Sequence, residues 1–444
     1  MTPTIRINTI RVRVLAACLA LVAPIACDTL SDPLDVEPAS RIPAATLETA
    51  ANASLLVNGA IGNFECAFNS YVVLGAAVGE ELIDATQTAA RFPYDSRKTV
   101  QTDTRYASST CGETYAGYTP LQIARSTADN MVARLKSWTD AEVAAGAGAP
   151  NRNFLLAQMA AYSGYAHVLL GEGFCTMALS QINLDKSVTF GGEIQRDSVF
   201  RMAVARFTEA IAAAAAAGSS PSAAAVADIR NMAFAGRARA KLDIGDYAGA
   251  KADAQQVPAG YVKDVSASGT VTRRNNLVFA ENSAAITSSS VGVPYRNLSD
   301  PRVPVAKGDQ RSVTGVDHWF QNKYPVIGSP LPLATYEEAQ LIIAEAEIRA
   351  NNLAAALPIL NASRARGNQG AFSASTQAAY LAELIDQRRR ELFLEGHHLG
   401  DVIRFAIAVQ PAAGTVYHGG GTYGSQICLP LPSVERLNNP LIGS

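Results

Sequence analysis

Three closely spaced carboxylates, Glu80, Glu81 and Asp84, form the densest group of acidic side chains that could do chemistry. Two carboxyl groups at a fixed separation are what a glycoside hydrolase needs for acid and base catalysis. Nothing in the sequence sets the separation of these three, and carboxylates are common at helix ends. A serine hydrolase is not indicated either, because the chain contains no G-x-S-x-G motif. We therefore expect no catalytic residue.

Two adjacent histidines, His397 and His398, stand near Asp401 and could suggest a metal site. Adjacent residues of a helix point about 100° apart, so both histidines would not face one ion. No third ligand has a suitable spacing. We expect these residues to be structural and predict no metal and no cofactor.

A glycine run, residues 419–421, lies between Tyr417 and Tyr423. It lacks the strand-to-helix context and the GK[ST] sequence of a phosphate-binding loop. We expect a flexible surface turn, with a place beside a ligand site as the alternative.

Sugar binding requires an aromatic face that stacks on the pyranose ring and polar groups that bind its hydroxyls. Trp319 lies among polar residues at 317–322 and is the best stacking candidate, whereas Trp138 ends a predicted helix and is expected in the core. The second-line ligand candidates are Asn69, Tyr71, Arg91 and Tyr94.

The first 26 residues are typical of a lipoprotein signal peptide. Three arginines precede the apolar run 14–26, which is too short to span a bilayer. Cleavage before Cys27 would place a lipid on that cysteine, and residues 27–43 would form a flexible tether. The alternatives are lipidation of Cys18, which few apolar residues precede, or a plain secretory peptide cleaved near Ala26. Each of them predicts export.

Export favours disulfide bonds among the four other cysteines. Three connectivities are possible for Cys66, Cys111, Cys175 and Cys428. We favour Cys66–Cys111 and Cys175–Cys428, with free buried thiols as the alternative. None of the four has the CxxC spacing of a metal or redox site.

Composition favours an all-α protein. Charged residues make up 17% of the chain and alanine is abundant, which suits closely packed helices. The net charge of −2 gives no reason to expect nucleic acid as a partner. We expect a single domain at 44–444.

Three helix pairs share small residues at their expected crossings and resemble tetratricopeptide hairpins. They are 153–170 with 198–217, 228–242 with 247–257, and 336–350 with 354–365. They predict a helical-repeat scaffold at about 150–257 and 334–405. Further helices are expected at 115–138 and at 46–82, the latter divided or broken by glycines.

Loop-rich sections are expected at about 68–112 and 258–333. Leu277–Phe279 has the composition of a short strand within the second section. A section of this length with several aromatic residues is expected to be ordered and functional.

The run from Gln387 to Arg404 carries the most specific motif of the chain and resembles the C-terminal helix motif of the RagB/SusD family. It departs from the family pattern at Gln387, His398 and Leu399. It keeps Arg388, Glu391, Leu392, Glu395, Gly396, Asp401 and Arg404. Weaker matches follow in order along the whole chain, among them Asp300–Arg302, Lys323–Pro325 and Leu429–Pro432.

The spacing of the same run indicates a structural role. Arg388, Glu391 and Glu395 are three and four residues apart, which predicts an ion-pair ladder on one helix face. Gly396 would stop that helix, and Asp401 would cap the next helix or pair with an arginine.

The resemblance implies a surface-exposed, lipid-anchored outer-membrane protein without enzymatic activity. Such proteins hold an oligosaccharide, or in some cases a peptide, and act as a hinged lid on a TonB-dependent, SusC-like transporter. Two alternatives remain: a periplasmic tetratricopeptide scaffold that binds another protein, and a secreted glycoside hydrolase.

Overall fold

The computed structural model describes residues 47–86, 88–283 and 286–443. The predicted signal peptide, the tether, Cys18 and Cys27 lie outside the described residues, as does the predicted domain boundary at residue 44. Residues Ala50–Ser444 form one compact unit, to which the following sections refer. Within the described ranges, no helix is long and apolar enough to cross a membrane.

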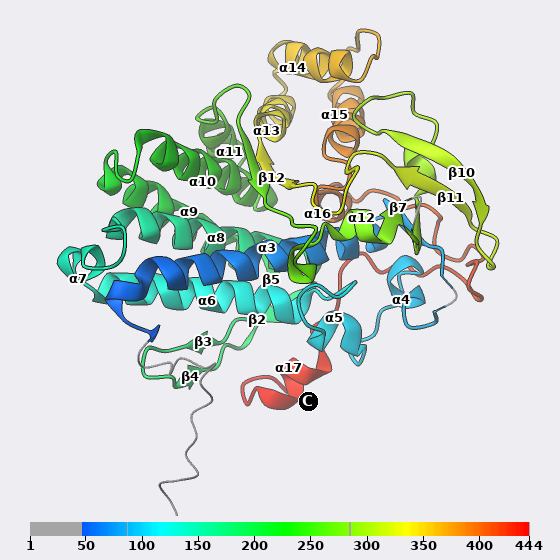
Figure 1. Cartoon of the computed structure of the whole chain (residues 1–444). Coiled ribbons are helices and arrows are strands. Elements are labelled where there is room, and N and C mark those ends of the chain that lie inside the picture. The colour runs from blue at the N-terminus through cyan, green and yellow to red at the C-terminus, as the bar shows by residue number, and fades with distance from the viewer. Residues whose placement is uncertain (1–46, 87, 284–285, 444) are drawn as a thin grey trace, which may run out of the picture. The chain divides into compact units, whose positions relative to one another are not determined.

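Successive helices pack side by side along most of the first half of the chain (Figure 1). They are α3 (Ala53–Val78), α6 (Tyr118–Ser137), α8 (Arg152–Gly173), α9 (Arg196–Ala217), α10 (Ala223–Asp243) and α11 (Tyr247–Ala254). Contacts join α8 to α9, α9 to α10 and α10 to α11. The expected all-α class and the first two predicted helix pairs are confirmed.

Glycines let these helices approach closely. Gly164 of α8 and Gly236 of α10 both lie against the ring of Phe207, which α9 places between them. A Cβ atom on Gly164 would lie only 2.7 Å from that ring. The small residues at the crossing positions therefore have a packing function.

Helix α3 is continuous, so the expected division at 46–82 is wrong, and so is the start of a loop-rich section at residue 68. From Phe64 onward nearly every residue of α3 is buried, since other helices cover it on several sides. Gly59 and Gly62 each cost about 1 kcal/mol relative to alanine in a helix, which this packing exceeds.

A second core joins three later helices, α13 (Tyr336–Arg349), α14 (Leu353–Arg366) and α15 (Gln377–Glu391). Apolar side chains of all three meet there, among them Leu341, Leu360 and Leu384. The third predicted pair is thus confirmed. The shorter helices are α4 (Phe92–Asp95), α5 (Thr104–Ser108), α7 (Asp140–Ala144), α12 (Leu277–Glu281), α16 (His398–Phe405) and α17 (Ser433–Asn438), with 3-10 turns η1 (Ala50–Asn52), η2 (Thr272–Arg274) and η3 (Val293–Tyr295).

The strands of the described part form six antiparallel pairs, β1–β9, β2–β5, β3–β4, β6–β12, β7–β8 and β10–β11. Their bounds are β1 Leu82–Asp84, β2 Thr176–Ala178, β3 Gln181–Ile182, β4 Val188–Thr189, β5 Glu193–Gln195, β6 Val262–Val265, β7 Asn282–Ser283, β8 Ile286–Thr287, β9 Ser289–Val291, β10 Val305–Arg311, β11 Asp317–Gln321 and β12 Leu331–Thr335. Much of the section 258–333 is therefore built from short strands.

The expected strand at Leu277–Phe279 is wrong, because these residues open helix α12. The side chain of Asn276 accepts a hydrogen bond from the backbone N–H of Phe279 at 3.0 Å, which caps the helix. Its amide also donates to the carbonyl of Ser329 at 2.9 Å. The cap decides against the strand that the apolar residues favoured.

The motif at 387–404 is structural, but the predicted ladder along one helix is wrong. Helix α15 ends at Glu391, because the next three residues turn into the core and are fully buried. Glu395 therefore lies beyond the helix, and Gly396, with φ +77°, serves the turn that follows it.

The ion pairs of the motif join distant segments instead. Arg388 binds Asp401 at 2.7 Å, and Glu391 accepts from Arg302 at 2.8 Å. Glu395 pairs with Lys323 at 2.6 Å. Arg404 binds Asp401 at 2.8 Å and also contacts Glu345 of α13. The expected pairing of Asp401 with an arginine is present, and the motif ties α15 and α16 to the rest of the unit.

Candidate ligand-binding face

Three of the expected ligand residues are buried, so they offer no surface to a ligand in this structure. Tyr71 and Tyr94 are 0% exposed and Asn69 is 2% exposed. The Tyr94 ring stacks on Tyr115 with 4.5 Å between centroids, and its hydroxyl donates to Asp103 at 2.7 Å. The amide of Asn69 donates to a carbonyl within α3. The expectation for these three residues is wrong because α3 and α4 turn them inward.

Arg91 lies just before α4 and holds two segments together. Its guanidinium pairs with Glu281 of α12, approaches Asp84 at 3.7 Å and lies over the Tyr115 ring. The carboxyl groups of Glu281 and Asp84 thus compensate the positive charge of the guanidinium. Arg91 therefore has a structural function here.

Trp319 is only partly buried and remains the stacking candidate. Its backbone is fixed on both sides, since its N–H donates to the Ser290 hydroxyl at 2.9 Å and its carbonyl accepts from Asn282 at 3.0 Å. The guanidinium of Arg296 lies over the indole, 5.4 Å from the ring centroid. Strand β11 thus presents Trp319 from a rigid position beside β9.

The partner strand β10 adds charged side chains to the same ribbon. Lys307 lies opposite Trp319 in the register of the two strands. Lys307 and Arg311 both reach the carboxylate of Asp317, at 3.5 and 2.8 Å. All of β10 except its first residue and Gly308 is exposed.

The loop 411–424 supplies an aromatic cluster next to α4. Tyr417 meets Phe92 and Tyr423 edge-on, with centroids 5.5 and 5.0 Å apart. The glycine run that the sequence placed in a surface turn also packs here, because a Cβ atom on Gly419 would lie 2.5 Å from Tyr417 and 2.9 Å from Phe92. Arg97 lies over the Tyr423 ring at 4.8 Å. Sequence reasoning noted the two tyrosines but gave no sign of the arginine.

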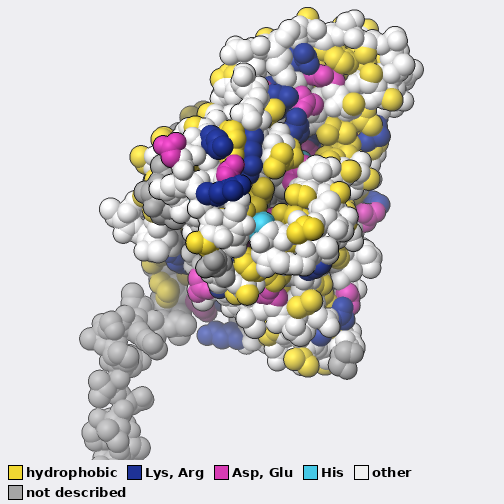
Figure 2. All heavy atoms as spheres, turned by 90° about the vertical axis from the view of Figure 1, so that its right-hand side faces the viewer, with side chains coloured by type: hydrophobic (Ala, Val, Ile, Leu, Met, Phe, Trp, Pro, Cys, Tyr) yellow, Lys and Arg dark blue, Asp and Glu magenta, His cyan; other side chains and the backbone are white. Residues whose placement is uncertain are grey.

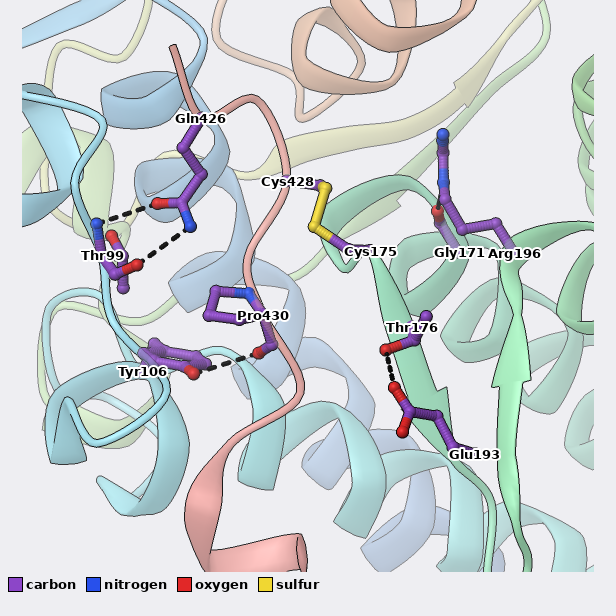
Figure 3. Close-up of a disulfide and its surroundings, with 10 residues drawn as sticks. All are labelled: Thr99, Tyr106, Gly171, Cys175, Thr176, Glu193, Arg196, Gln426, Cys428 and Pro430. Carbon is purple, nitrogen blue, oxygen red and sulfur yellow. Dashed lines mark hydrogen bonds between the residues drawn. A yellow bond between two sulfur atoms is a disulfide. The ribbon is translucent and has the colours of Figure 1, made fainter. Parts of the chain in front are cut away.

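The C-terminal segment that carries this loop is attached at three places (Figure 3). The side-chain amide of Gln426 accepts from the backbone N–H of Thr99 at 2.8 Å and donates to the carbonyl of Thr99 at 2.9 Å. The hydroxyl of Tyr106 donates to the carbonyl of Pro430 at 3.0 Å. Between these contacts, a disulfide joins Cys428 to Cys175 at the end of α8.

A second disulfide, Cys66–Cys111, ties α3 to the segment between α5 and α6. The four cysteines are thus paired in the arrangement that the sequence analysis favoured. The two bonds hold segments that flank the candidate face.

We name the surface formed by the β10–β11 ribbon, Arg296, residues 91–98 and the loop 411–424 the ribbon–loop face. Its parts meet through β1 and β9. The Ser290 hydroxyl of β9 donates to the carbonyl of Asp317 at 2.7 Å, and a ring nitrogen of His418 lies 2.6 Å from the carbonyl of Asp84 in β1. Figure 2 views the molecule from this side.

Two titratable groups inside the ribbon–loop face are uncharged near neutral pH. Burial, reinforced by the charge of Asp84, raises the pKa of Asp95 to about 8. Burial also lowers the pKa of His418. With Asp95 protonated and His418 neutral, the other charged groups of the face are its lysines and arginines and the carboxylates Asp309 and Asp317.

Glu80 and Glu81 are buried, and Glu80 accepts a hydrogen bond from the backbone N–H of Gln410, next to the loop 411–424. An oxygen of Glu81 accepts from the backbone N–H of Leu394 at 2.7 Å, and Glu80 lies 3.5 Å from His398. His397 contacts Arg239 at 3.3 Å. No cluster of histidine, cysteine or acidic residues in the described ranges has the arrangement of a metal site.

Concave pockets occur elsewhere in the unit. One of about 440 Å³ lies beside α5 and is lined by polar residues such as Asp103 and Arg105. Another of about 300 Å³ lies between α6, α8 and α9 and contains Arg125, His167 and Arg206. Neither presents an aromatic ring of Phe, Tyr or Trp. Trp319 lines neither of these two pockets.

Comparison with protein families matches residues 329–428 to the SusD family. The matched segment contains the 387–404 motif and the loop 411–424. Compared with curated proteins, the sequence matches none.

Solved structures with the same fold cover nearly the whole unit. A SusD superfamily protein from Bacteroides thetaiotaomicron has a TM-score of 0.66 and 14% identity, over 89% of this chain and 99% of that chain. A SusD-like carbohydrate binding protein from Bacteroides vulgatus has a TM-score of 0.64 and 13% identity, over 89% and 97%. A SusD superfamily protein from Parabacteroides distasonis has a TM-score of 0.63 and 13% identity, over 88% and 97%.

Proposed function

We propose that this chain is a SusD-family protein that binds an oligosaccharide on the ribbon–loop face. The match of residues 329–428 to the SusD family supports this, as does the likeness of the fold to solved SusD superfamily structures. The observation that carries the proposal is the indole of Trp319 on β11, which is partly exposed and whose backbone is held by hydrogen bonds. Polar side chains surround it, as recognition of a sugar requires. One protein of the same fold is described as carbohydrate binding, which supports this class of ligand.

The proposal includes delivery of the ligand to a TonB-dependent, SusC-like outer-membrane transporter, with the chain acting as a hinged lid. A lipid on Cys27 would hold the protein at the outer membrane, exposed at the cell surface, while the tether 27–43 allows movement. The match to the SusD family supports both parts. A non-enzymatic role accords with the burial of Glu80 and Glu81.

Calorimetric titration of the purified chain with oligosaccharides tests the binding function. We expect Trp319→Ala to weaken binding at least about fivefold, because an aromatic contact contributes on the order of 1 kcal/mol. Thermal unfolding should be unchanged, since the side chain is partly exposed. Phe190→Ala removes an exposed ring outside the ribbon–loop face and serves as the control. A loss of stability in Trp319→Ala equal to the loss of affinity would assign the indole to packing.

Purification of the tagged chain from native membranes tests the partner. We expect a large outer-membrane transporter to co-purify, and Cys27→Ser to release the protein from the membrane fraction. Lipid attached to Cys18 in the mass spectrum would refute the assignment of Cys27. Recovery of a periplasmic protein together with peptide binding, without a transporter, would favour the scaffold alternative.

A further inference from the structure

Two arginines of the ribbon–loop face, Arg97 and Arg296, have no carboxylate partner in the described part of the chain. Both are wholly or partly buried. Arginines buried elsewhere in the unit bind carboxylates directly, as Arg239 does with Glu172 at 2.5 Å and Arg388 with Asp401 at 2.7 Å. A buried charge without a counter-ion is costly, so its presence calls for an explanation.

Arg296 is fixed by neutral groups only. Its Nε donates to the carbonyl of Val291 at 2.8 Å, and one Nη approaches the Ser290 hydroxyl at 3.3 Å. The guanidinium lies over the Trp319 indole. These contacts orient the guanidinium beside the indole. None of them is a carboxylate that would neutralise its positive charge.

Neutral groups also hold Arg97, which lies beside Tyr423. It donates to the carbonyls of Gly424 and Pro411 and lies over the Tyr423 ring. The phenol of Tyr423 lies within electrostatic reach of both Arg97 and Arg296. Carbonyl oxygens hold the guanidinium but do not cancel its charge.

Carboxyl groups lie within electrostatic reach of these cations without forming an ion pair with them: Asp95 and Glu80 near Arg97, and Asp317 near Arg296. Asp95 approaches Arg97 electrostatically, but its pKa of about 8 leaves it mostly protonated at neutral pH. His418 is neutral there, because burial lowers its pKa. Burial lowers the pKa of Arg97 and Arg296 as well, as expected of charges without a counter-ion.

Exposed residues extend the positive charge over the ribbon–loop face. Lys98 binds the hydroxyl of Thr422 at 3.1 Å, and Lys307 and Arg311 share the single carboxylate of Asp317. Asp309 is an exposed carboxylate of β10. Figure 2 shows Lys and Arg side chains gathered in a band on this side of the molecule. The face therefore carries net positive charge although the whole chain has a net charge of −2.

We propose that the ligand of the ribbon–loop face is an acidic oligosaccharide, one whose sugars carry carboxylate or sulfate groups. This inference rests on the proposed function. A sugar ring stacked on Trp319 would place its acidic substituent beside Arg296, whose planar guanidinium matches carboxylate and sulfate oxygens. The surrounding lysines and arginines would attract the polyanion over a longer range.

Titration of the full chain with paired oligosaccharides of equal length tests the substrate class. Oligogalacturonate and chondroitin sulfate hexamers are compared with the neutral xylohexaose and maltohexaose. We expect at least about tenfold tighter binding of an acidic hexamer. That preference should be lost as NaCl is raised from 20 to 500 mM, because the Debye length falls from about 20 Å to about 4 Å.

Substitutions of Arg296 test whether this side chain binds the acidic group of the ligand. Arg296→Gln should weaken binding of the acidic hexamer about tenfold more than it weakens binding of a neutral hexamer, whereas Arg296→Lys should retain most of the acidic binding. Arg230→Gln removes the same charge from the exposed side of α10 and is the matched control. If Arg296→Gln fails to fold, Lys307→Gln with Arg311→Gln on the exposed strand should lower acidic binding in its place.

The outcomes separate the two proposals. Preference for neutral hexamers, or equal effects of Arg296→Gln and Arg230→Gln, would overturn the acidic class while oligosaccharide binding stands. Absence of binding to every hexamer, with a transporter still co-purifying, would overturn the acidic class together with oligosaccharide recognition on this face.

Discussion

At the scale of single residues, ion pairs in the core join segments far apart in the sequence. The side chains of Arg388 and Asp401 are 4% and 8% exposed, and Arg404 links the same carboxylate to Glu345 of α13. Because desolvation cancels much of the attraction, such a pair adds little net free energy, but removing one partner leaves an uncompensated charge. These residues therefore specify where α15 and α16 dock.

Arg388→Met tests this role. We expect the free energy of unfolding to fall by about 3–5 kcal/mol, because Asp401 loses its buried partner. The matched variant Lys136→Met removes an exposed partner of Glu209, 53% accessible, and should cost about 1 kcal/mol or less. Urea unfolding of both variants measures the difference. Equal losses would show that the docking of α15 and α16 does not depend on this pair.

The pH dependence of stability follows from the buried carboxyl of Glu81. Burial raises its pKa from 4.5 to about 7. Between these values the folded state holds a proton that the unfolded state has released, so stability falls as pH rises. Relative to the wild type, Glu81→Gln should gain stability from pH 4.5 to 7, on the order of 3 kcal/mol at most, and gain no more above pH 7.

Chemical unfolding at several pH values measures this gain. Glu142→Gln is the control, because its carboxylate is exposed in the capping box of α7 and hydrogen bonds from Thr139 lower its pKa. Its stability relative to the wild type should stay constant between pH 5 and 7. A constant difference for Glu81→Gln over the same range would show that Glu81 is ionised in the folded protein.

At the scale of elements, glycines have opposite roles in two neighbouring helices. Gly164 of α8 touches the ring of Phe207 from α9, whereas Gly59 of α3 has no atom beyond its own helix within 4 Å of a Cβ position. Helix propensity would favour alanine at both positions, but only the second can accept it. Contact between elements therefore decides which glycine the fold requires.

Alanine substitutions separate these roles. Gly164→Ala should destabilise the protein by about 1–3 kcal/mol or more, because the new methyl group meets the Phe207 ring at 2.7 Å. Gly59→Ala should stabilise it by about 0.5–1 kcal/mol. Thermal unfolding compares the two, and Phe207→Leu should restore part of the loss in Gly164→Ala. Stabilisation by both substitutions would contradict the close packing of α8 on α9.

At the scale of the whole unit, the C-terminal segment returns to the end of α8 and completes the ribbon–loop face. The Cys175–Cys428 disulfide bridges a sequence separation of 253 residues and lies beside the loop 411–424. Cross-links over long separations restrict the unfolded chain most in the entropic account. This bond should matter for both stability and ligand affinity.

Replacing Cys175 and Cys428 by serine should lower the free energy of unfolding by about 2–5 kcal/mol. Hydrogen exchange should increase at 411–430, and oligosaccharide affinity should fall because Tyr423 and Arg97 lose their support. The paired control replaces Cys66 and Cys111, which close a separation of 45 residues outside the loop. Unchanged exchange at 411–430 would show that Gln426 and Pro430 hold the segment without the disulfide.

Sequence by itself determined the helical class, the three helix pairs and the family motif at 387–404, because spacing and small residues report directly on helix packing. It favoured Trp319 as a ligand contact but also chose the buried Tyr71 and Tyr94, since residue type does not reveal burial. Tertiary structure alone decided that α3 is continuous and that Arg388 pairs with Asp401. It alone set Arg97 over Tyr423 and Arg296 over Trp319, because contacts between segments far apart in the sequence leave no local pattern.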